Sequence, residues 1–237
     1  MGEAKQRGSK EQRIAEARLR DAHKPSMPLA CASADSHELL QRMIPIYREM
    51  DAHLNESPAH IDCAPGCSFC CYYHVLVTPA EAFALAEFIE NSEVATRDAI
   101  KTRVIATAER VAPLSQSEYM QTNIPCAFLE NGRCAVYPLR PAACRGFHSR
   151  DVGVCKRAFE NPRSAEPQAV DSHRQRVLVR HTGAFFKANS HAGCEVAAYE
   201  MHGAVASALV DPEAFSRWRR GATTFPSVRD RTPIVQR

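Results

Sequence analysis

Four of the ten cysteines of this 237-residue chain fall within one short segment, Cys63-Ala-Pro-Gly-Cys67-Ser-Phe-Cys70-Cys71. Two thiols separated by two or three residues can close a tight loop around one metal centre, because this spacing turns both sulfurs to the same side. Pro65 and Gly66 suit the sharp backbone turn that such a loop needs. The segment 63–71, called the cysteine knuckle below, therefore predicts a metal-binding loop.

A second block of cysteines lies in a segment that predicts a β-hairpin, PCAFLENGRCAVYPLRPAACRGF, residues 125–147. Asn131-Gly132 stands between two short apolar runs, as in a hairpin with a type I′ turn. Two-residue pairing places Cys134 across from Leu129. The same register would set Cys126 across from Tyr137, with its sulfur on the opposite face. Either Cys126 precedes the regular pairing or the two cysteines serve different centres, and both interpretations stay open.

Pro141 then opens a short helical turn that carries Cys144 and Arg145. Soft thiolates select zinc, copper(I) or iron–sulfur clusters over hard cations. Four thiolates close a tetrahedral zinc site or hold a 4Fe–4S cluster. Adjacent Cys70 and Cys71 favour a cluster, a two-metal site, or one ligand beside a free thiol. We predict an iron–sulfur cluster, slightly favoured over zinc, with ligands from Cys63, Cys67, Cys70, Cys71, Cys126, Cys134 and Cys144.

Two other interpretations of the cysteines were weighed against metal binding. Buried cysteines act as small hydrophobes, but core packing gives no reason to gather thiols around Pro and Gly. A disulfide framework needs an oxidising compartment. The N-terminal sequence is charged and lacks the apolar segment of a signal peptide, and no apolar run approaches membrane-spanning length. We therefore expect a protein of the reducing cytoplasm.

Composition and motifs exclude several classes of function. The net charge of +3 is mixed along the chain, so there is no electrostatic case for binding nucleic acid or membranes. No Ser-His-Asp arrangement, phosphate loop or dinucleotide fingerprint is present. Without a catalytic motif, the sequence favours a non-enzymatic protein but leaves the question open. The expected partner is a metal ion or cluster, and no protein partner is indicated.

Helical segments surround the two cysteine blocks. Residues 36–55 repeat apolar side chains with a helical period. After a short extended run at 72–78, Thr78-Pro79-Ala80-Glu81 has the pattern of a capping box that opens a helix. A second helix is expected over residues 93–112. We expect these last two helices to form a hairpin that packs against the knuckle.

The remaining sequence predicts further helices and a mainly α fold with one small β-hairpin. The later helices are expected over 154–160, 168–189 and 192–210, with a last one capped by Asp211-Pro212 and ending at Gly221. The predicted organisation is a charged N-terminal arm (1–30), one cysteine-rich, metal-centred domain (31–222) with its metal core at 60–160, and a loose tail (223–237).

The motifs in order resemble a known family. C-x3-C-x2-CC, then Cys126-Ala-Phe-Leu, Cys134-Ala-Val-Tyr and Arg140-Pro141-x-x-Cys144-Arg145, is similar to the bacterial YkgJ-type cysteine-cluster family, CxxCxxCC, described as zinc- or iron-chelating domains. The resemblance covers roughly residues 60–160. It implies that the seven cysteines bind metal and that Arg145 and the Arg140-Pro141 turn are fixed features. A larger relative, the flagellin lysine methylase, implies by analogy alone a link to methyl transfer.

Other candidates have weaker signals. Cys63-x3-Cys67-Ser-Phe-Cys70 also fits the radical SAM pattern, but that fold needs repeated βα units and a Gly-rich segment, which the chain lacks. Cys155, Tyr199-Glu200 and Trp218 resemble features of the C-terminal part of one subgroup of the family. Cys31 and Cys194 match no motif. His74 and His148 stand near the cysteine blocks, where we expect hydrogen-bonded histidines more than ligands.

Three classes of function fit these observations. The first is a metal protein for storage, delivery or sensing, and the second is an iron–sulfur redox or SAM-linked methyl-transfer enzyme component. The third is a structural zinc module. A site with every ligand buried favours the structural module, whereas an open coordination position beside a pocket favours the enzyme.

Overall fold

The computed structural model describes residues 38–164 and 166–233, which form a mainly helical single domain with a few short antiparallel strands. The predicted arm at 1–30 and Cys31 lie outside these residues. The helices are α2 Leu39–Asn55, α3 Pro79–Glu90, α4 Val94–Val111, α5 Gln116–Met120, α6 Ala142–Gly146, α7 Val152–Glu160, α8 Ser172–His191, α9 Met201–Val210 and α10 Ala214–Arg219. Two 3-10 turns are η4 Phe69–Tyr72 and η5 Tyr137–Leu139. The prediction of a mainly α fold is confirmed.

Helix α3 occupies the centre of the core. The predicted capping box is confirmed: the Thr78 N–H donates to Glu81 Oε2 (2.8 Å) and the Glu81 N–H donates to Thr78 Oγ1 (3.3 Å). The helix is apolar on nearly every side and is buried between α2 and α9, as expected for a helix without a polar face. Helices α2 and α4 confirm the predictions for 36–55 and 93–112.

A three-stranded antiparallel sheet, which the sequence did not predict as a whole, lies beside these helices. Its strands are β1 Leu76–Val77, β4 Ala197–Glu200 and β5 Arg231–Pro233, in the order β1-β4-β5. Strand β1 confirms the extended run after the knuckle. The helix predicted over 192–210 is wrong in its first half, because Gly193 adopts a φ of +73° and the chain continues into β4 before α9 begins.

The C-terminal segment is packed rather than loose. Phe225 is fully buried, and β5 pairs with β4 along one edge of the sheet. The predicted loose tail is therefore wrong for residues 224–233. The last helix begins at Ala214, slightly later than predicted, although the Glu213 N–H still donates to Asp211 Oδ1 (3.0 Å).

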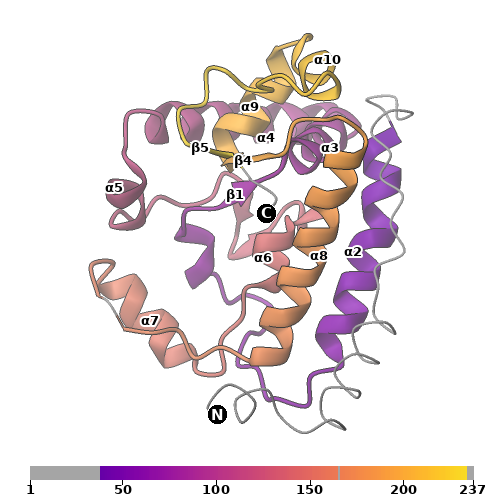
Figure 1. Cartoon of the computed structure of the whole chain (residues 1–237). Helices are drawn as coiled ribbons and strands as arrows, with labels where there is room; N and C mark the ends of the chain where they lie inside the picture. Colours follow the sequence, from indigo (N-terminus) through magenta and orange to yellow (C-terminus); the bar gives the residue numbers. More distant parts are fainter. Residues whose placement is uncertain (1–37, 165, 234–237) are drawn as a thin grey trace, which may run out of the picture.

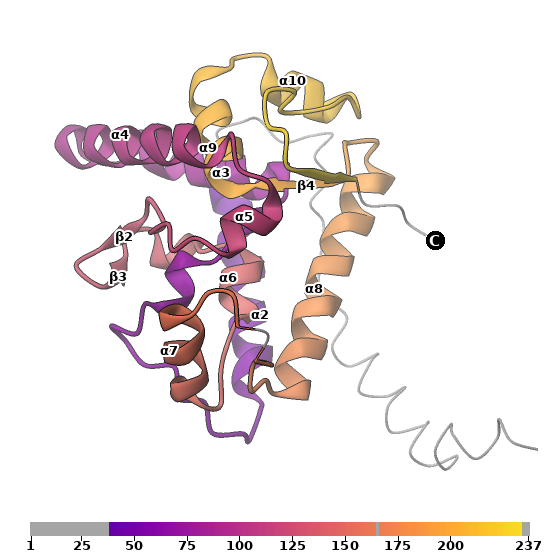
Figure 2. The same ribbon diagram turned by 90° about the vertical axis from the view of Figure 1, so that its left-hand side faces the viewer.

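The segments that carry the cysteines of the knuckle and hairpin lie on one side of the molecule. Helices α2 and α8 pack side by side along the opposite flank, with the sheet and α10 at one end (Figure 1). The hairpin strands β2 and β3, and helix α7, lie on the side away from α8 (Figure 2). No helix in the described part of the chain has the length and apolar run needed to cross a membrane.

Candidate metal centre

The predicted hairpin is present and short. Strands β2 Leu129–Glu130 and β3 Arg133–Cys134 pair antiparallel, with Leu129 opposite Cys134 as predicted. Asn131 and Gly132 have φ values of 49° and 74°, as a type I′ turn requires. A longer ladder in the same register would pair Cys126 with Tyr137, but the ladder spans two residues in each strand and Tyr137 begins η5. Cys126 therefore precedes the regular pairing.

The knuckle and the hairpin block adjoin each other. The backbone N–H of Cys126 donates to the carbonyl of Cys71 at 2.8 Å. At the hairpin tip, a Cβ added to Gly132 would lie 3.8 Å from the carbonyl oxygen of Gly66, which sits at the turn of the knuckle. The fold thus brings together two cysteine blocks that are separated in the sequence by α3, α4 and α5.

Electrostatic interactions among the thiols divide them into two sets that share Cys70. The hairpin set is Cys70, Cys126, Cys134 and Cys144. The knuckle set is Cys63, Cys67, Cys70 and Cys155. Cys71 stands beside both, with its side chain hydrogen-bonded to that of Cys70. All seven predicted cysteines therefore lie in one region, together with Cys155.

Burial favours the protonated form of Cys63, Cys134 and Cys144 by raising the pKa of each thiol. Burial raises the pKa of Cys134 to about 11 and that of Cys144 well above its usual range, and neighbouring thiols raise both further. Burial also raises the pKa of Cys63. A nucleophilic or redox-active cysteine needs a lowered pKa, so these thiols fit a different role. A bound cation reverses the effect by stabilising thiolates, which is the chemistry of metal ligands.

Cys155 joins the site through helix α7. The Phe159 ring on this helix packs against the rings of Phe69 and Tyr72, with centroids 5.7 and 4.8 Å apart. The Cys155 thiol is buried and donates to Gln168 Oε1 at 3.7 Å. Cys155 lies far from the knuckle in the sequence, so the sequence alone did not predict it as part of the metal centre. The packing of α7 on η4 brings it next to the knuckle cysteines. Cys194, by contrast, packs within the hydrophobic core.

Glu81 connects the knuckle side of the core to the helix that carries Cys144. Beyond its capping role, its Oε1 accepts from the Tyr47 hydroxyl (3.1 Å) and from the backbone N–H of Ala142 (2.8 Å). Its side chain is buried. One carboxylate therefore joins α2, α3 and α6, a role that the capping pattern alone did not indicate.

The two arginines of the second block have different roles. Arg145 pairs with the Asp51 carboxylate, donates to the Pro138 carbonyl (2.7 Å) and lies over the Tyr47 ring (4.4 Å). It is thus an ion-pair residue that holds α6 against α2. Arg140 is the cation whose charge acts on the thiols, since it lowers the pKa of Cys70 and Cys134 against the larger effects that raise them.

Among the described residues, His202 is a histidine that contacts a cysteine, and no motif in the sequence indicates this role. His74 hydrogen-bonds to Asp230, and both ring nitrogens of His148 are engaged by backbone groups. His202 is buried, hydrogen-bonds to the Cys126 side chain and donates from Nδ1 to Glu200 Oε1 (2.8 Å). Burial alone would lower its pKa, but these two partners raise it to about 9. Cys126 and His202 lie far apart in the sequence, so their spacing gives no indication of this contact.

The thiols are gathered but not yet arranged as a coordination shell. Among residues 38–164 and 166–233, no three His, Cys, Asp or Glu side chains stand in an arrangement that would hold a metal ion. A cysteine side chain turns about one bond between a few rotamers. Ligation by these cysteines therefore requires their side chains to rotate toward a common point.

These features define a mainly helical, cysteine-rich domain with the donor set of a metal-binding protein. A family model described as CxxCxxCC, "Putative zinc- or iron-chelating domain", matches residues 62–162. This match confirms the family resemblance over residues 62–162, and the description of the family supports metal binding by that segment. Comparisons with curated proteins and with solved structures give no match.

Proposed function

We propose that the protein binds an iron–sulfur cluster, or zinc in its place, through both cysteine blocks and serves in metal storage, delivery or sensing in the cytoplasm. The observation that carries this proposal is the 2.8 Å hydrogen bond from the Cys126 N–H to the Cys71 carbonyl, which joins the two blocks. If the bound metal is zinc and never exchanges, the protein is instead a structural zinc module.

The number of thiols supports a cluster or a pair of metals over a single zinc ion. One tetrahedral zinc needs four ligands, whereas the hairpin set and the knuckle set supply eight cysteines with Cys71 included. Cys70 belongs to both sets, so a centre there draws on ligands from each side. Sulfur-rich surroundings of this kind suit iron–sulfur clusters.

Anaerobic purification followed by iron, zinc and acid-labile sulfide analysis tests the proposal. We expect a brown protein with iron and sulfide in equal amounts. A colourless protein with zinc alone would select the zinc version, and absence of both metals would overturn the proposal.

A matched pair of variants tests the ligands in the same preparation. Cys144→Ser replaces a half-buried cysteine of the hairpin set, and we expect metal content to fall at least by half. Ala143→Ser adds a hydroxyl at an exposed neighbouring position of α6 and should leave metal content unchanged. Equal metal content in the two variants would exclude Cys144 as a ligand.

A second candidate function is an enzyme that uses the centre for redox or methyl-transfer chemistry. It is favoured by a cavity whose lining includes Tyr119 and Glu200, both of which contact His202, the buried residue that hydrogen-bonds to the Cys126 side chain. A metal centre beside a cavity suits a catalytic role better than a closed structural site.

A further inference from the structure

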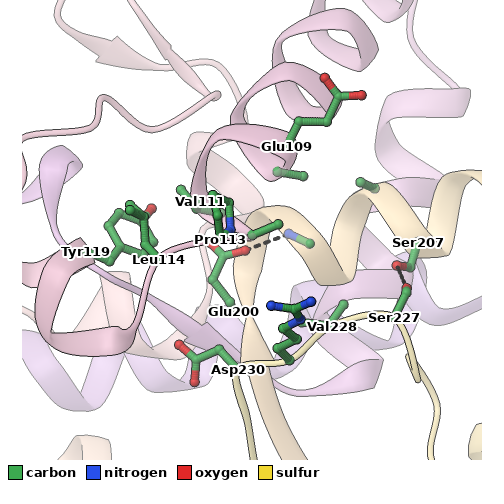
Figure 3. Close-up of a pocket in the computed structure, with 15 residues that line it drawn as sticks. Glu109, Val111, Pro113, Leu114, Tyr119, Glu200, Ser207, Ser227, Val228 and Asp230 are labelled. Carbon is green, nitrogen blue, oxygen red and sulfur yellow. Dashed lines mark hydrogen bonds between the residues drawn. The ribbon is translucent and has the colours of Figure 1, made fainter.

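A cavity of about 520 Å³ opens between the end of α4, helix α9 and the segment before β5 (Figure 3). Its size lies within the range of cavities that hold small molecules. It is lined by Ala108, Glu109, Val111, Ala112, Pro113, Leu114, Tyr119, Glu200, Gly203, Ala206, Ser207, Ser227, Val228, Arg229 and Asp230. None of the seven predicted metal ligands lines it, so it is separate from the cysteine region.

The cavity lining holds charges of both signs that have no partner. Within the described residues, the Arg229 guanidinium and the Glu109 carboxylate are exposed and make no hydrogen bond or ion pair. Asp230 uses Oδ2 to bind His74, which leaves Oδ1 without a described partner. Glu200 differs, since its two oxygens accept from His202 and Gly203. A bound molecule therefore meets one free cation and two carboxylates with free oxygens.

The rest of the lining is apolar on one side and hydroxylic on the other. Val111, Pro113 and Leu114 come from the end of α4 and the turn after it, opposite Ser207 and Ser227 (Figure 3). The two serine hydroxyls lie 3.3 Å apart. A ligand that fits this lining combines charged groups with an apolar chain that can cover Val111, Pro113 and Leu114.

Tyr119 supplies a further donor at the floor of the cavity. Its hydroxyl oxygen lies 3.3 Å from Nδ1 of His202. That nitrogen carries a proton, because it donates to Glu200 at 2.8 Å. The Tyr119 hydroxyl can therefore only accept from this ring, and its own proton is left for a ligand.

The same residues connect the cavity to the cysteine region. Glu200 and Tyr119 line the cavity and both contact His202. His202 in turn hydrogen-bonds to the Cys126 side chain. One buried side chain thus separates a molecule in the cavity from a thiol of the hairpin set.

We propose that this cavity binds a small zwitterion with an apolar chain, a molecule of the α-amino acid class. Its ammonium group pairs with Asp230, and its carboxylate pairs with Arg229, since charge-assisted hydrogen bonds are the strong ones in such sites. Its chain covers the apolar wall formed by Val111 and Leu114. Its role as a substrate or effector of the metal centre rests on the proposed function, whereas the binding itself does not.

Isothermal titration of the full chain with three probes tests the charge requirement. Norleucine carries both charges, hexanoate lacks the ammonium group and pentylamine lacks the carboxylate, while all three share the same apolar chain. We expect norleucine to bind about tenfold more tightly than either of the others, the effect of one charge-assisted hydrogen bond. Equal binding of the three, or no binding of norleucine, would overturn the proposal.

Two variants locate the binding. Arg229→Ala removes an exposed cation without a described partner, and we expect it to weaken norleucine binding about tenfold while pentylamine is unaffected. Ala112→Trp fills the cavity from an exposed position and should abolish binding. Ala95→Trp, at an exposed position near the other end of α4, is its matched control. Loss of binding in the control, or binding retained in Ala112→Trp, would place the probe elsewhere and overturn the proposal.

Metal analysis on the same samples separates this proposal from the proposed function. Norleucine binding by a protein that holds no metal would leave the cavity assignment standing and remove the metal function. A metal-loaded protein that binds no norleucine would do the reverse.

Discussion

At the scale of single residues, Glu81 has the largest structural role near the site. Four donors from three segments converge on its carboxylate, two of them from the capping box and the others from Tyr47 and Ala142. In Glu81→Gln an amide NH2 replaces one of the two acceptor oxygens. This NH2 group is itself a donor, so it would face a buried donor and leave it without an acceptor. We expect the free energy of unfolding to fall by about 1–3 kcal/mol, measured by urea denaturation.

The matched control for this change is Glu118→Gln. Glu118 closes the capping box of α5 with Ser115 in the same way, but it is exposed to solvent. Its replacement should destabilise the protein much less. Equal effects of the two substitutions would mean that Glu81 acts only as a helix cap.

The raised thiol pKa values give the metal-free protein a definite pH dependence. Burial raises the pKa of Cys134 to about 11 and that of Cys144 well above its usual range, whereas an unfolded thiol ionises near pH 8.5. The stability contributed by these protonated thiols is complete below that pH and is lost as pH rises through the folded pKa values. We expect the unfolding free energy of the metal-free protein to decline above about pH 8.5.

Metal affinity should change in the opposite direction. Ligation requires thiolates, so binding releases protons and the apparent affinity rises with pH. Titrations with zinc at several pH values, in buffers of different ionisation enthalpy, measure the released protons. An affinity that does not depend on pH would show that the buried thiols are not the ligands.

At the scale of elements, the hairpin depends on its turn. Gly132 has a φ of +74° and lies beside the Gly66 carbonyl at the knuckle. Gly132→Ala must hold an L-residue in the left-handed region, so we expect a loss of about 1 kcal/mol in unfolding free energy. Gly183→Ala is the control, because Gly183 lies inside α8 with open space around it and alanine there should stabilise by about 0.5–1 kcal/mol. Changes of the same sign would contradict this account.

Local signals predicted some elements, and long-range pairing decided others. The Thr78–Glu81 capping pattern and the Asn131-Gly132 turn act within a few residues, so their outcome was readable from the sequence. Strand β4 has no such signal. Its sequence, Ala-Ala-Tyr-Glu at 197–200, fits a helix equally well, and it is a strand because β1 and β5 pair with it on both sides.

At the scale of the whole molecule, the two cysteine blocks and the helical core have different sources of stability. Helices α2, α3 and α9 bury apolar side chains against one another. Residues of the knuckle are mostly half-buried or exposed and bury little apolar surface, so backbone entropy of about 1–2 kcal/mol per residue is poorly opposed there. We expect metal ligation, which contributes on the order of 10 kcal/mol in structural zinc sites, to supply the stability that these loops lack.

Hydrogen exchange on metal-free and metal-loaded protein measures this coupling. We expect metal to increase protection in residues 60–75 and 125–147, with little change in α2 and α3. Cys67→Ser should reduce both the metal content and the added protection, while α8 and α9 stay formed. Equal protection in the two states would mean that the site is preformed and that the metal is not structural.

The difference between local sequence signals and tertiary packing explains which part of the site the sequence predicted. The seven cysteines were predicted as ligands because their spacing within two short blocks is itself a signal. Cys155 lies at the site only because helix α7 packs on η4. His202 lies there because helix α9, which carries it, begins directly after strand β4. Such contacts depend on tertiary packing, which spacing along the chain does not encode.

The most direct test of the central claim is X-ray absorption fine structure of the metal in the anaerobically purified protein. If the two cysteine blocks hold the metal, its first shell consists of sulfur, about four atoms at about 2.3 Å. This sulfur shell should be lost or reduced in Cys70→Ser, because Cys70 belongs to both sets of thiols. A first shell of oxygen and nitrogen, unchanged in Cys70→Ser, would contradict the account.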